Sequence, residues 1–380
     1  MSRIFLPIFL SIFILGSIGV FPIFQEASAS TVKICDDETI STGIFKNIKV
    51  AEGKSCTITG DAIIEKNLTA DGANSVIVDS LTSISIGGNV KIINSLGTIQ
   101  INNAEINGNV RLLDNFDQDI LITNSHIDKN LILKNNSIDE SVAFPAFKIY
   151  LRDSTINGNV IFNNNTTGDD LILHTNTING KVVLKNNRVL GNDILLFSNV
   201  IDGNIQFVNN FADGEIDLID NTVSGNTNIK GNDTNQQFYI QHNVIDGTFS
   251  MKQQKNENTD FIIAQNEIGR DMKITENIQN NIYLSVNTVQ NNILIEKNNS
   301  SSLTIVQNDS EGKFVVKKNT VESTFGGSTG IYLLENSSLE KIVVTKNIVE
   351  TDLLCSGNSP DPTGGKNIVG GSKLEQCSTL

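Results

Sequence analysis

Through the middle of this 380-residue chain, a short apolar stretch ends in asparagine about every eleven residues. Two kinds of interval alternate. In one kind a Gly or Asn follows four positions later, as Gly180 follows Asn176, and the other kind leads into a more variable polar segment. The repeating unit is therefore about 22 residues long. Such a unit cannot bury its apolar face alone, so the repeat predicts an array in which each unit stacks on the next.

Asparagines at equivalent places in stacked units can join their side-chain amides into a ladder. The sequence predicts two such ladders, one for each half of the repeat. Their central members are Asn176, Asn199, Asn221 and Asn243 in one half and Asn165, Asn187, Asn210 and Asn232 in the other, and the spacing continues through Asn266, Asn277, Asn287, Asn298, Asn308 and Asn319.

Four to six residues with period-two alternation precede each asparagine, as in residues 238–242, and this pattern predicts strands. Gly and Asn at the turns are expected to accommodate a left-handed backbone. Proline lacks the N–H that a strand paired on both sides must donate, and Pro145 is the only proline between Thr31 and Ser359. The sequence therefore predicts an all-β fold, a single right-handed parallel β-helix solenoid with about 22 residues per coil.

A leucine-rich repeat is the alternative architecture, because its units also contain about 20 to 29 residues with an asparagine at a fixed place. The full Leu-x-x-Leu-x-Leu-x-x-Asn pattern is not sustained here, and both half-units have the pattern of strands. These two differences favour the β-helix.

The first thirty residues resemble an export signal. Arg3 supplies a positive charge, residues 4–19 an apolar stretch, and Ala27-Ser28-Ala29 a cleavage site of small residues. We expect cleavage after Ala29 and a secreted protein, at the cell surface or in the surrounding matrix. An uncleaved membrane anchor is the alternative, because residues 4–24 are apolar and just long enough to span a bilayer.

The four cysteines fit an extracellular compartment. Cys35 and Cys56 lie about one coil apart near the start of the array, and Cys355 and Cys377 lie about one coil apart at its end, so we expect one local disulfide in each pair. These disulfides would close the ends of the array, where unpaired strand edges invite aggregation. A Zn²⁺ site is the alternative, which the wide gaps within each pair and the lack of a nearby His disfavour.

These features divide the chain into four parts. They are the signal segment 1–29, an N-terminal cap 30–60, the β-helix repeats 61–354 and a C-terminal disulfide cap 355–380. Two places break the eleven-residue rhythm and predict insertions, near 139–148 and near 322–330. Insertions in a solenoid form loops on its flank, where a partner can touch it.

Several coils contain Gly-Asn-Val or Gly-Asn-Ile, beginning at Gly88, Gly108, Gly158 and Gly203, and the tail 355–377 has the order Cys, Asn-Ser-Pro, Gly-Gly, Asn, Gly, Gln-Cys. On these motifs, residues from about 31 to 380 resemble the right-handed parallel β-helix superfamily that includes pectate lyases. More narrowly, the chain resembles secreted prokaryotic repeat proteins with such coils and such a cap. The resemblance implies a pectin-lyase-like fold and no particular enzymatic activity.

The pectinolytic members of that superfamily place acids and a basic residue in a groove on one sheet. Asp169 and Asp170 are the nearest match in this chain and its only catalytic candidates, but the expected companions Gly-His-Gly and Arg-Ile-Lys are absent. Acids also occupy strand entries for turn reasons alone. His126, His174 and His242 are predicted on different coils. We therefore predict no catalytic site, no cofactor and no metal site.

The formal net charge is −14. An acidic surplus of this size repels nucleic acids, and it also repels acidic polysaccharides unless Ca²⁺ bridges them. We therefore expect a non-catalytic structural or interaction role, with an extracellular protein or glycan as partner and with membrane contact only if the signal segment is retained. A polysaccharide lyase or hydrolase is the alternative, because grooved β-helices act on glycans and the fold alone does not decide function.

Overall fold

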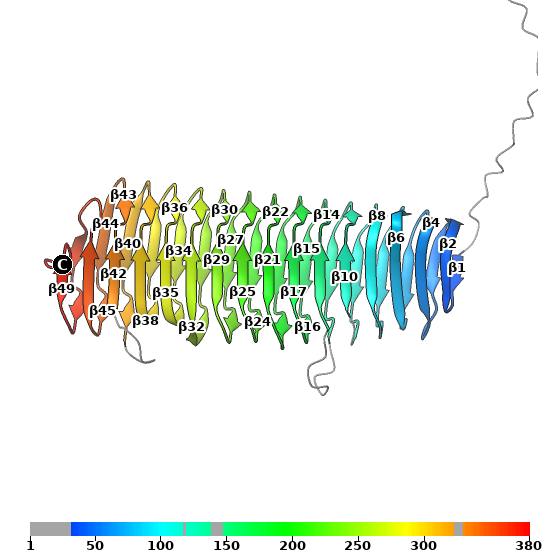
Figure 1. Cartoon of the computed structure of the whole chain (residues 1–380), viewed down its shortest axis with the longest axis horizontal. Helices are drawn as coiled ribbons and strands as arrows, with labels where there is room; N and C mark the ends of the chain where they lie inside the picture. Colours follow the sequence, from blue (N-terminus) through cyan, green and yellow to red (C-terminus); the bar gives the residue numbers. More distant parts are fainter. Residues whose placement is uncertain (1–31, 117–118, 138–146, 323–329) are drawn as a thin grey trace, which may run out of the picture.

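The computed structural model describes residues 32–116, 119–137, 147–322 and 330–380, without the side chains of residues 256–258. The predicted signal segment 1–29 lies outside the described residues, as does most of the two predicted insertions. Within the described ranges every regular element is a strand, and the strands of successive coils pair in parallel. They stack into a rod (Figure 1).

Each coil contributes one strand to each of two long sheets. Sheet A contains β1 (Val32–Cys35), β3 (Asn47–Val50), β5 (Leu68–Asp71), β7 (Val90–Ile93), β9 (Val110–Leu113), β12 (Leu131–Lys134), β15 (Val160–Asn163), β19 (Val182–Lys185), β23 (Ile205–Val208), β27 (Thr227–Lys230), β31 (Phe249–Lys252), β34 (Met272–Thr275), β37 (Ile293–Glu296), β40 (Lys313–Lys317), β44 (Lys341–Thr345) and β47 (Thr363–Gly365). Sheet B contains β2 (Glu38–Phe45), β4 (Ser55–Ile64), β6 (Ser75–Ile86), β8 (Ile99–Ile106), β10 (Ile120–Thr123), β13 (Ile149–Arg152), β17 (Leu171–His174), β21 (Ile194–Phe197), β25 (Ile216–Ile219), β29 (Phe238–Gln241), β32 (Lys255–Ala264), β35 (Ile278–Ser285), β38 (Asn299–Val306), β42 (Gly330–Leu334), β46 (Asp352–Ser356) and β49 (Lys373–Glu375).

A corner and a two-residue strand follow most of these strands. After sheet B come β11 (His126–Ile127), β14 (Thr155–Ile156), β18 (Thr177–Ile178), β22 (Val200–Ile201), β26 (Thr222–Val223), β30 (Val244–Ile245), β33 (Glu267–Ile268), β36 (Thr288–Val289), β39 (Asp309–Ser310) and β43 (Ser337–Ser338). After sheet A come β16 (Thr166–Thr167), β20 (Arg188–Val189), β24 (Phe211–Ala212), β28 (Asp233–Thr234), β41 (Thr320–Val321), β45 (Ile348–Val349) and β48 (Ile368–Val369). The coil is therefore two similar half-units of about eleven residues.

The predicted all-β solenoid is confirmed. Ile149 pairs with Leu171, and Leu171 with Ile194, so equivalent residues lie 22 or 23 positions apart. The predicted disulfides near the two ends are confirmed as well, Cys35 with Cys56 and Cys355 with Cys377. With strands about 4.8 Å apart, the stack is on the order of 70 Å long.

Alternate residues of both sheets point inward and form one continuous apolar core. Ile, Val and Leu fill most of its positions, and its largest members are phenylalanines. Phe238 packs edge-to-face against Phe207 and Phe261, with ring centroids 6.4 and 5.6 Å away. Burying one such side chain contributes about 1.5–3 kcal/mol, so the stacked core is the main source of stability.

The strands on either side of each predicted insertion stay in register. Thr123 of β10 pairs with Arg152 of β13, 29 positions later, and Val306 of β38 pairs with Leu334 of β42, 28 positions later. The extra residues therefore do not shift the register of the paired coils on either side. Phe147, at the end of the first insertion, is buried.

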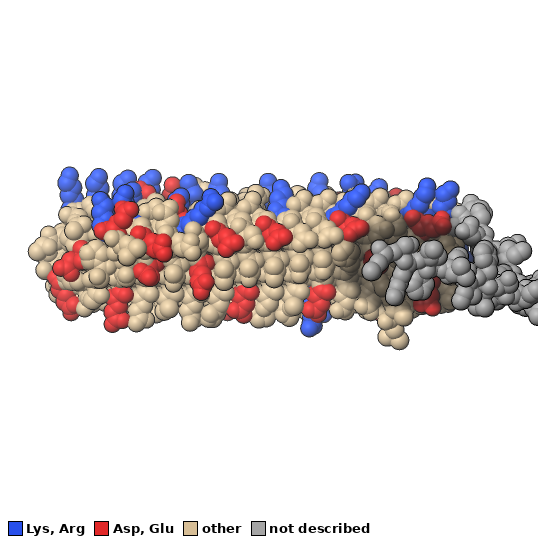
Figure 2. Space-filling model, turned by 90° about the horizontal axis from the view of Figure 1, so that it is seen from above, with Lys and Arg blue, Asp and Glu red and all other residues tan. Residues whose placement is uncertain are grey.

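Charged side chains lie in lines along the rod. In Figure 2, lysines and arginines gather along one edge, and acids are scattered over the visible face. Thirteen of the 28 lysines and arginines form what we call the basic stripe, which takes in outward positions near the ends of the sheet A strands and corner residues after them: Lys49, Lys91, Arg111, Lys134, Lys185, Lys230, Lys252, Lys273, Lys297, Lys317, Lys318, Lys346 and Lys366. The acids at equivalent places are fewer: Asp36, Asp37, Glu52, Asp71, Asp114, Glu276 and Glu296. The net charge of −14 therefore conceals a basic face.

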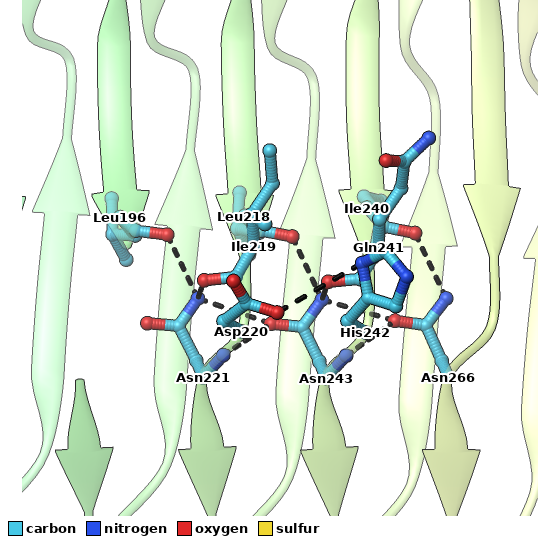
Figure 3. Close-up of polar contacts among 10 residues, drawn as sticks. All are labelled: Leu196, Leu218, Ile219, Asp220, Asn221, Ile240, Gln241, His242, Asn243 and Asn266. Atoms are coloured by element: carbon cyan, nitrogen blue, oxygen red, sulfur yellow. Dashed lines mark hydrogen bonds and ion pairs between the residues drawn. The ribbon is translucent and has the colours of Figure 1, made fainter. Parts of the chain in front are cut away.

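Buried asparagines join the coils at both corners. In the sheet B corner, the backbone N–H and the side-chain Nδ2 of Asn199 donate to Oδ1 of Asn221 at 3.1 and 3.0 Å, and Nδ2 of Asn199 also donates to the carbonyl of Leu173 at 2.9 Å. Asn221 repeats this arrangement with Asn243 and Leu196, and Asn243 with Asn266 (Figure 3).

The same contacts join the other predicted members. In the sheet A corner Asn165 donates to Asn187, Asn187 to Asn210, and Asn210 to Asn232. The sheet B ladder continues beyond the predicted set to Asn358 and Gln376. Each coil is thereby fixed to the next through side chains as well as through strand pairing.

The left-handed backbone lies directly after the strands, where several coils have the expected Asn or Gly, such as Asn209 and Gly231, and not at the glycines of the tight turns. The residue just before each ladder asparagine has a positive φ, for example 55° at Ser198 and 55° at His242, whereas the glycines four positions after the asparagine do not. Those glycines provide space instead: a Cβ on Gly203 would lie 2.6 Å from the carbonyl oxygen of Gly180 in the preceding coil. The expectation was therefore wrong about the glycines of the tight turns, because close contact between backbones, and not backbone conformation, requires them.

Asn221→Ala should lower the free energy of unfolding by about 1–3 kcal/mol, because it leaves buried donors of Asn199 and the carbonyl of Leu196 without partners. Asn226→Ala is the matched control. Asn226 also accepts an inter-coil hydrogen bond, from the N–H of Thr248 at 2.8 Å, but it is exposed and water replaces it. Urea denaturation of both variants measures the difference. Equal stability losses would contradict a structural role for burial of the ladder.

Candidate functional site

The two predicted catalytic candidates lie where the chain enters β17. Asp169 accepts a hydrogen bond from Nδ2 of Asn192 at 2.8 Å, and Asp170 accepts one from the backbone N–H of Asp193 at 3.2 Å. Both acids thus connect their coil to the next one. Partial burial raises the pKa of Asp170, and the nearby Asp169 and Asp193 add to the effect.

The stacking of acids continues along this edge of sheet B. Asp193 accepts the backbone N–H of Glu215 at 2.6 Å, and Asp217 stands two residues further on, in β25. Burial raises the pKa of Glu215, and Asp193 raises it further. The pKa of Asp217 rises to about 7, chiefly through burial and then through Glu215 and Asp193. Asp217 Oδ1 is buried and has no hydrogen-bond partner among the described residues.

Asp217 belongs to a line of outward-facing side chains that we call the tyrosine column. It runs through ten coils in strict register: Tyr150, Ile172, Leu195, Asp217, Tyr239, Ile262, Tyr283, Thr304, Tyr332 and Leu354. All four tyrosines of the chain lie in it, and Asp217 is its one charged member. Leu195 on one side and the aromatic ring of Tyr239 on the other contribute to the desolvation of this carboxyl.

The start of the column forms a shallow depression of about 280 Å³. Four coils line it, with the residues Tyr150, Ile172, His174, Leu195, Phe197, Asp217 and Ile219. The rings of His174 and Phe197 stack with centroids 5.1 Å apart. This surface offers apolar and aromatic contact area with one protonatable carboxyl, a composition suited to binding.

The histidines do not meet, as expected. His126 contacts Asp128 at 2.9 Å on one flank, His174 faces outward beside the tyrosine column, and His242 lies at a corner 3.8 Å from Asp220 (Figure 3). Among the described residues no three His, Cys, Asp or Glu side chains are grouped as metal ligands would be.

Sequence reasoning missed the tyrosine column, although the signal is present. Tyr239, Tyr283 and Tyr332 each stand four residues before a ladder asparagine. Tyr150 stands four residues before Ser154, which takes the place of an asparagine in the same ladder. Aligning the coils on this corner residue would have revealed the column.

A third ladder, on the surface, was also missed. It consists of Asn47, Asn67, Asn89, Asn109, Asn130 and Asn159, each of which accepts the backbone N–H of the equivalent residue in the next coil. Asn89, Asn109 and Asn159 are the asparagines of the Gly-Asn-Val motifs. The motif was noted for its resemblance alone, and its inter-coil hydrogen bond is the physical reason for it.

Comparisons with family models, with curated proteins and with solved structures found no match for this chain. Within the described ranges, no helix has the length and apolarity that crossing a bilayer requires.

Asp217→Asn should stabilise the protein above neutral pH. The folded state holds a proton on Asp217 up to a pH of about 7, whereas the unfolded chain releases it near pH 4, so this carboxyl costs stability increasingly as the pH rises between those values. Solvent screening reduces the effect to on the order of 1 kcal/mol. Thermal melts at pH 5 and pH 8 would show a larger gain at pH 8. Asp202→Asn, at an exposed turn, is the control, and a gain equal at both pH values would contradict the assignment.

Proposed function

We propose that this protein is a non-catalytic rod that works outside the cell by binding an extended protein or glycan along sheet B. The tyrosine column carries the proposal. A line of aromatic and apolar side chains through ten coils is far longer than a small-molecule site, and its spacing of about 4.8 Å per coil suits a partner that runs along the rod.

Export is part of the proposal. The apolar N-terminal segment with its Ala27-Ser28-Ala29 site supports secretion or surface attachment, and two disulfides in the chain are consistent with an oxidising compartment. We also propose membership of the right-handed, pectin-lyase-like β-helices, on the parallel coils of about 22 residues and the Gly-Asn-Val motifs.

The exported protein should begin near Ser30. Intact-mass measurement of the chain recovered from the medium or the cell surface tests this. A mass that retains residues 4–24 would show a membrane anchor in place of a cleaved signal.

A glycan lyase or hydrolase is the second candidate, because Asp217 combines a raised pKa with a position beside a depression, as a general acid does. Such an enzyme also needs a second reacting group. Asp169 and Asp170 form hydrogen bonds to the next coil, Asp217 Oδ1 has no hydrogen-bond partner among the described residues, and His174, which lines the same depression, lies two coils from Asp217. These observations favour binding over catalysis.

Two assays separate the candidates. In the first, the purified protein is incubated with plant, algal and bacterial polysaccharides, with and without Ca²⁺, and we expect no new reducing ends or unsaturated uronates. Products that are lost in Asp217→Asn or in the double variant Asp169→Ala and Asp170→Ala would overturn the non-catalytic proposal.

The second assay measures binding of the protein to the isolated cell envelope of the producing organism. Changing Tyr283 and Tyr332 together to Ala should weaken binding at least fivefold, because it removes two aromatic contacts that lie two coils apart. Thr304→Ala, between them in the column, should have little effect. Unchanged binding by all of these variants would show that the partner does not bind at the tyrosine column.

A further inference from the structure

The N-terminal part of the basic stripe borders a second depression, of about 280 Å³, on the side of the rod that carries sheet A. Asn67, Asn89 and Asn109 of the surface ladder line one side of it, and Lys91 and Arg111 line the other. Lys91 in β7 and Arg111 in β9 are direct register partners in neighbouring coils. The depression therefore runs along the rod axis over three coils, with an asparagine from each coil and with Thr69, Lys91 and Arg111 in register beside them.

The polar groups that line this depression are chiefly hydrogen-bond donors. The Oδ1 of Asn67 accepts from the N–H and Nδ2 of Asn89, and the Oδ1 of Asn89 accepts in the same way from Asn109, at 2.9–3.3 Å. Each Nδ2 donates one of its two hydrogens in this contact, and the other hydrogen remains available to a ligand. With the ammonium of Lys91 and the guanidinium of Arg111, the surface offers N–H groups whose complement is a chain rich in acceptors and negative charge.

The cations of this part of the stripe are uncompensated. Lys91, Arg111 and Lys134 are exposed and form no ion pair with a described residue. Farther along the stripe, in contrast, Lys252 pairs with Glu276 at 3.3 Å and Lys318 with Glu296 at 3.2 Å. Lys91 and Arg111 are therefore available to an external anion, with the exposed acids Asp71 on the coil before Lys91 and Asp114 on the coil of Arg111.

We propose that this depression binds a linear anionic polysaccharide lying parallel to the rod. Its anionic groups contact Lys91 and Arg111, and its hydroxyl and ring oxygens accept hydrogen bonds from the surface asparagines. The net charge of −14 does not prevent this, because salt screens the field of acids that lie more than about 8–10 Å away. This surface is separate from the tyrosine column, so the proposal extends the proposed function without depending on that column.

Other polyanions fit less well. The phosphates of duplex DNA wind around its axis, whereas these cations form a straight line, and the residues that line the depression include no aromatic ring on which the bases of a single strand could stack. A lipid surface offers phosphates but no chain of acceptors for the row of amides. A second copy of the rod would bring its own net negative charge, but its acids are spread over several lines.

Dextran sulfate is the probe, with uncharged dextran as its control, and calorimetry on the full exported chain measures binding. We expect dextran sulfate to bind, with an affinity that falls steeply as salt rises, and dextran not to bind. Changing Lys91 and Arg111 together to Gln should weaken binding at least tenfold. The charge-preserving pair Lys91→Arg and Arg111→Lys should retain it.

The matched control changes Arg270 and Lys341 to Gln, which removes the same charge from exposed positions on distant coils and should alter affinity less than twofold. The tyrosine variants should bind dextran sulfate normally, so failure here and failure of the proposed function are distinguishable. Equal binding by the wild type and the Lys91 and Arg111 double Gln variant would overturn the proposal. Tighter binding of duplex DNA or of anionic vesicles than of dextran sulfate would also overturn it. So would self-association of the wild type at low salt that the Lys91 and Arg111 double Gln variant abolishes.

Discussion

The structure depends on one repeated contact. The side-chain amide of a buried asparagine joins its own coil to the asparagine of the next coil and to a strand of the preceding coil. A typical ladder asparagine such as Asn221 accepts two hydrogen bonds and donates at least two, so the polar groups of a tight corner are satisfied without water. The contact also fixes register, since a shift by one residue would move the amide out of reach and the apolar side chains out of the core. Straight columns on the surface follow from this.

The ladders also explain the unusual backbone beside them. A left-handed conformation costs roughly 1–2 kcal/mol for residues other than glycine, yet Ser198, His242 and even the β-branched Val286 adopt it. The hydrogen bonds of the adjacent asparagine hold the corner in place whatever side chain precedes it. The sequence does not show this position, because no single residue type marks it.

The main lines of the fold could be predicted from sequence, since the period of the asparagines, the alternation before them and the scarcity of proline all follow from local chemistry. The two disulfides could be predicted for the same reason: each joins residues about one coil apart, Cys35 with Cys56 and Cys355 with Cys377. The candidate surfaces could not be found in this way. Tyr150 and Tyr332 lie far apart in the chain. The two insertions break the spacing of the coils, and Ser154 replaces a ladder asparagine, so only the pairing of strands places the two tyrosines in one column. The net charge alone did not predict the basic stripe for a similar reason: it is a sum over all faces of the rod, and the fold places cations and acids in different lines.

Native-state hydrogen exchange tests the ladder account most directly. If the buried asparagines hold the coils together, the backbone amides of Asn199, Asn221 and Asn243 should exchange as slowly as those of the core strands, although they lie at corners, and more slowly than the amide of Asn226. Exchange at these three amides as fast as at Asn226 would contradict the account.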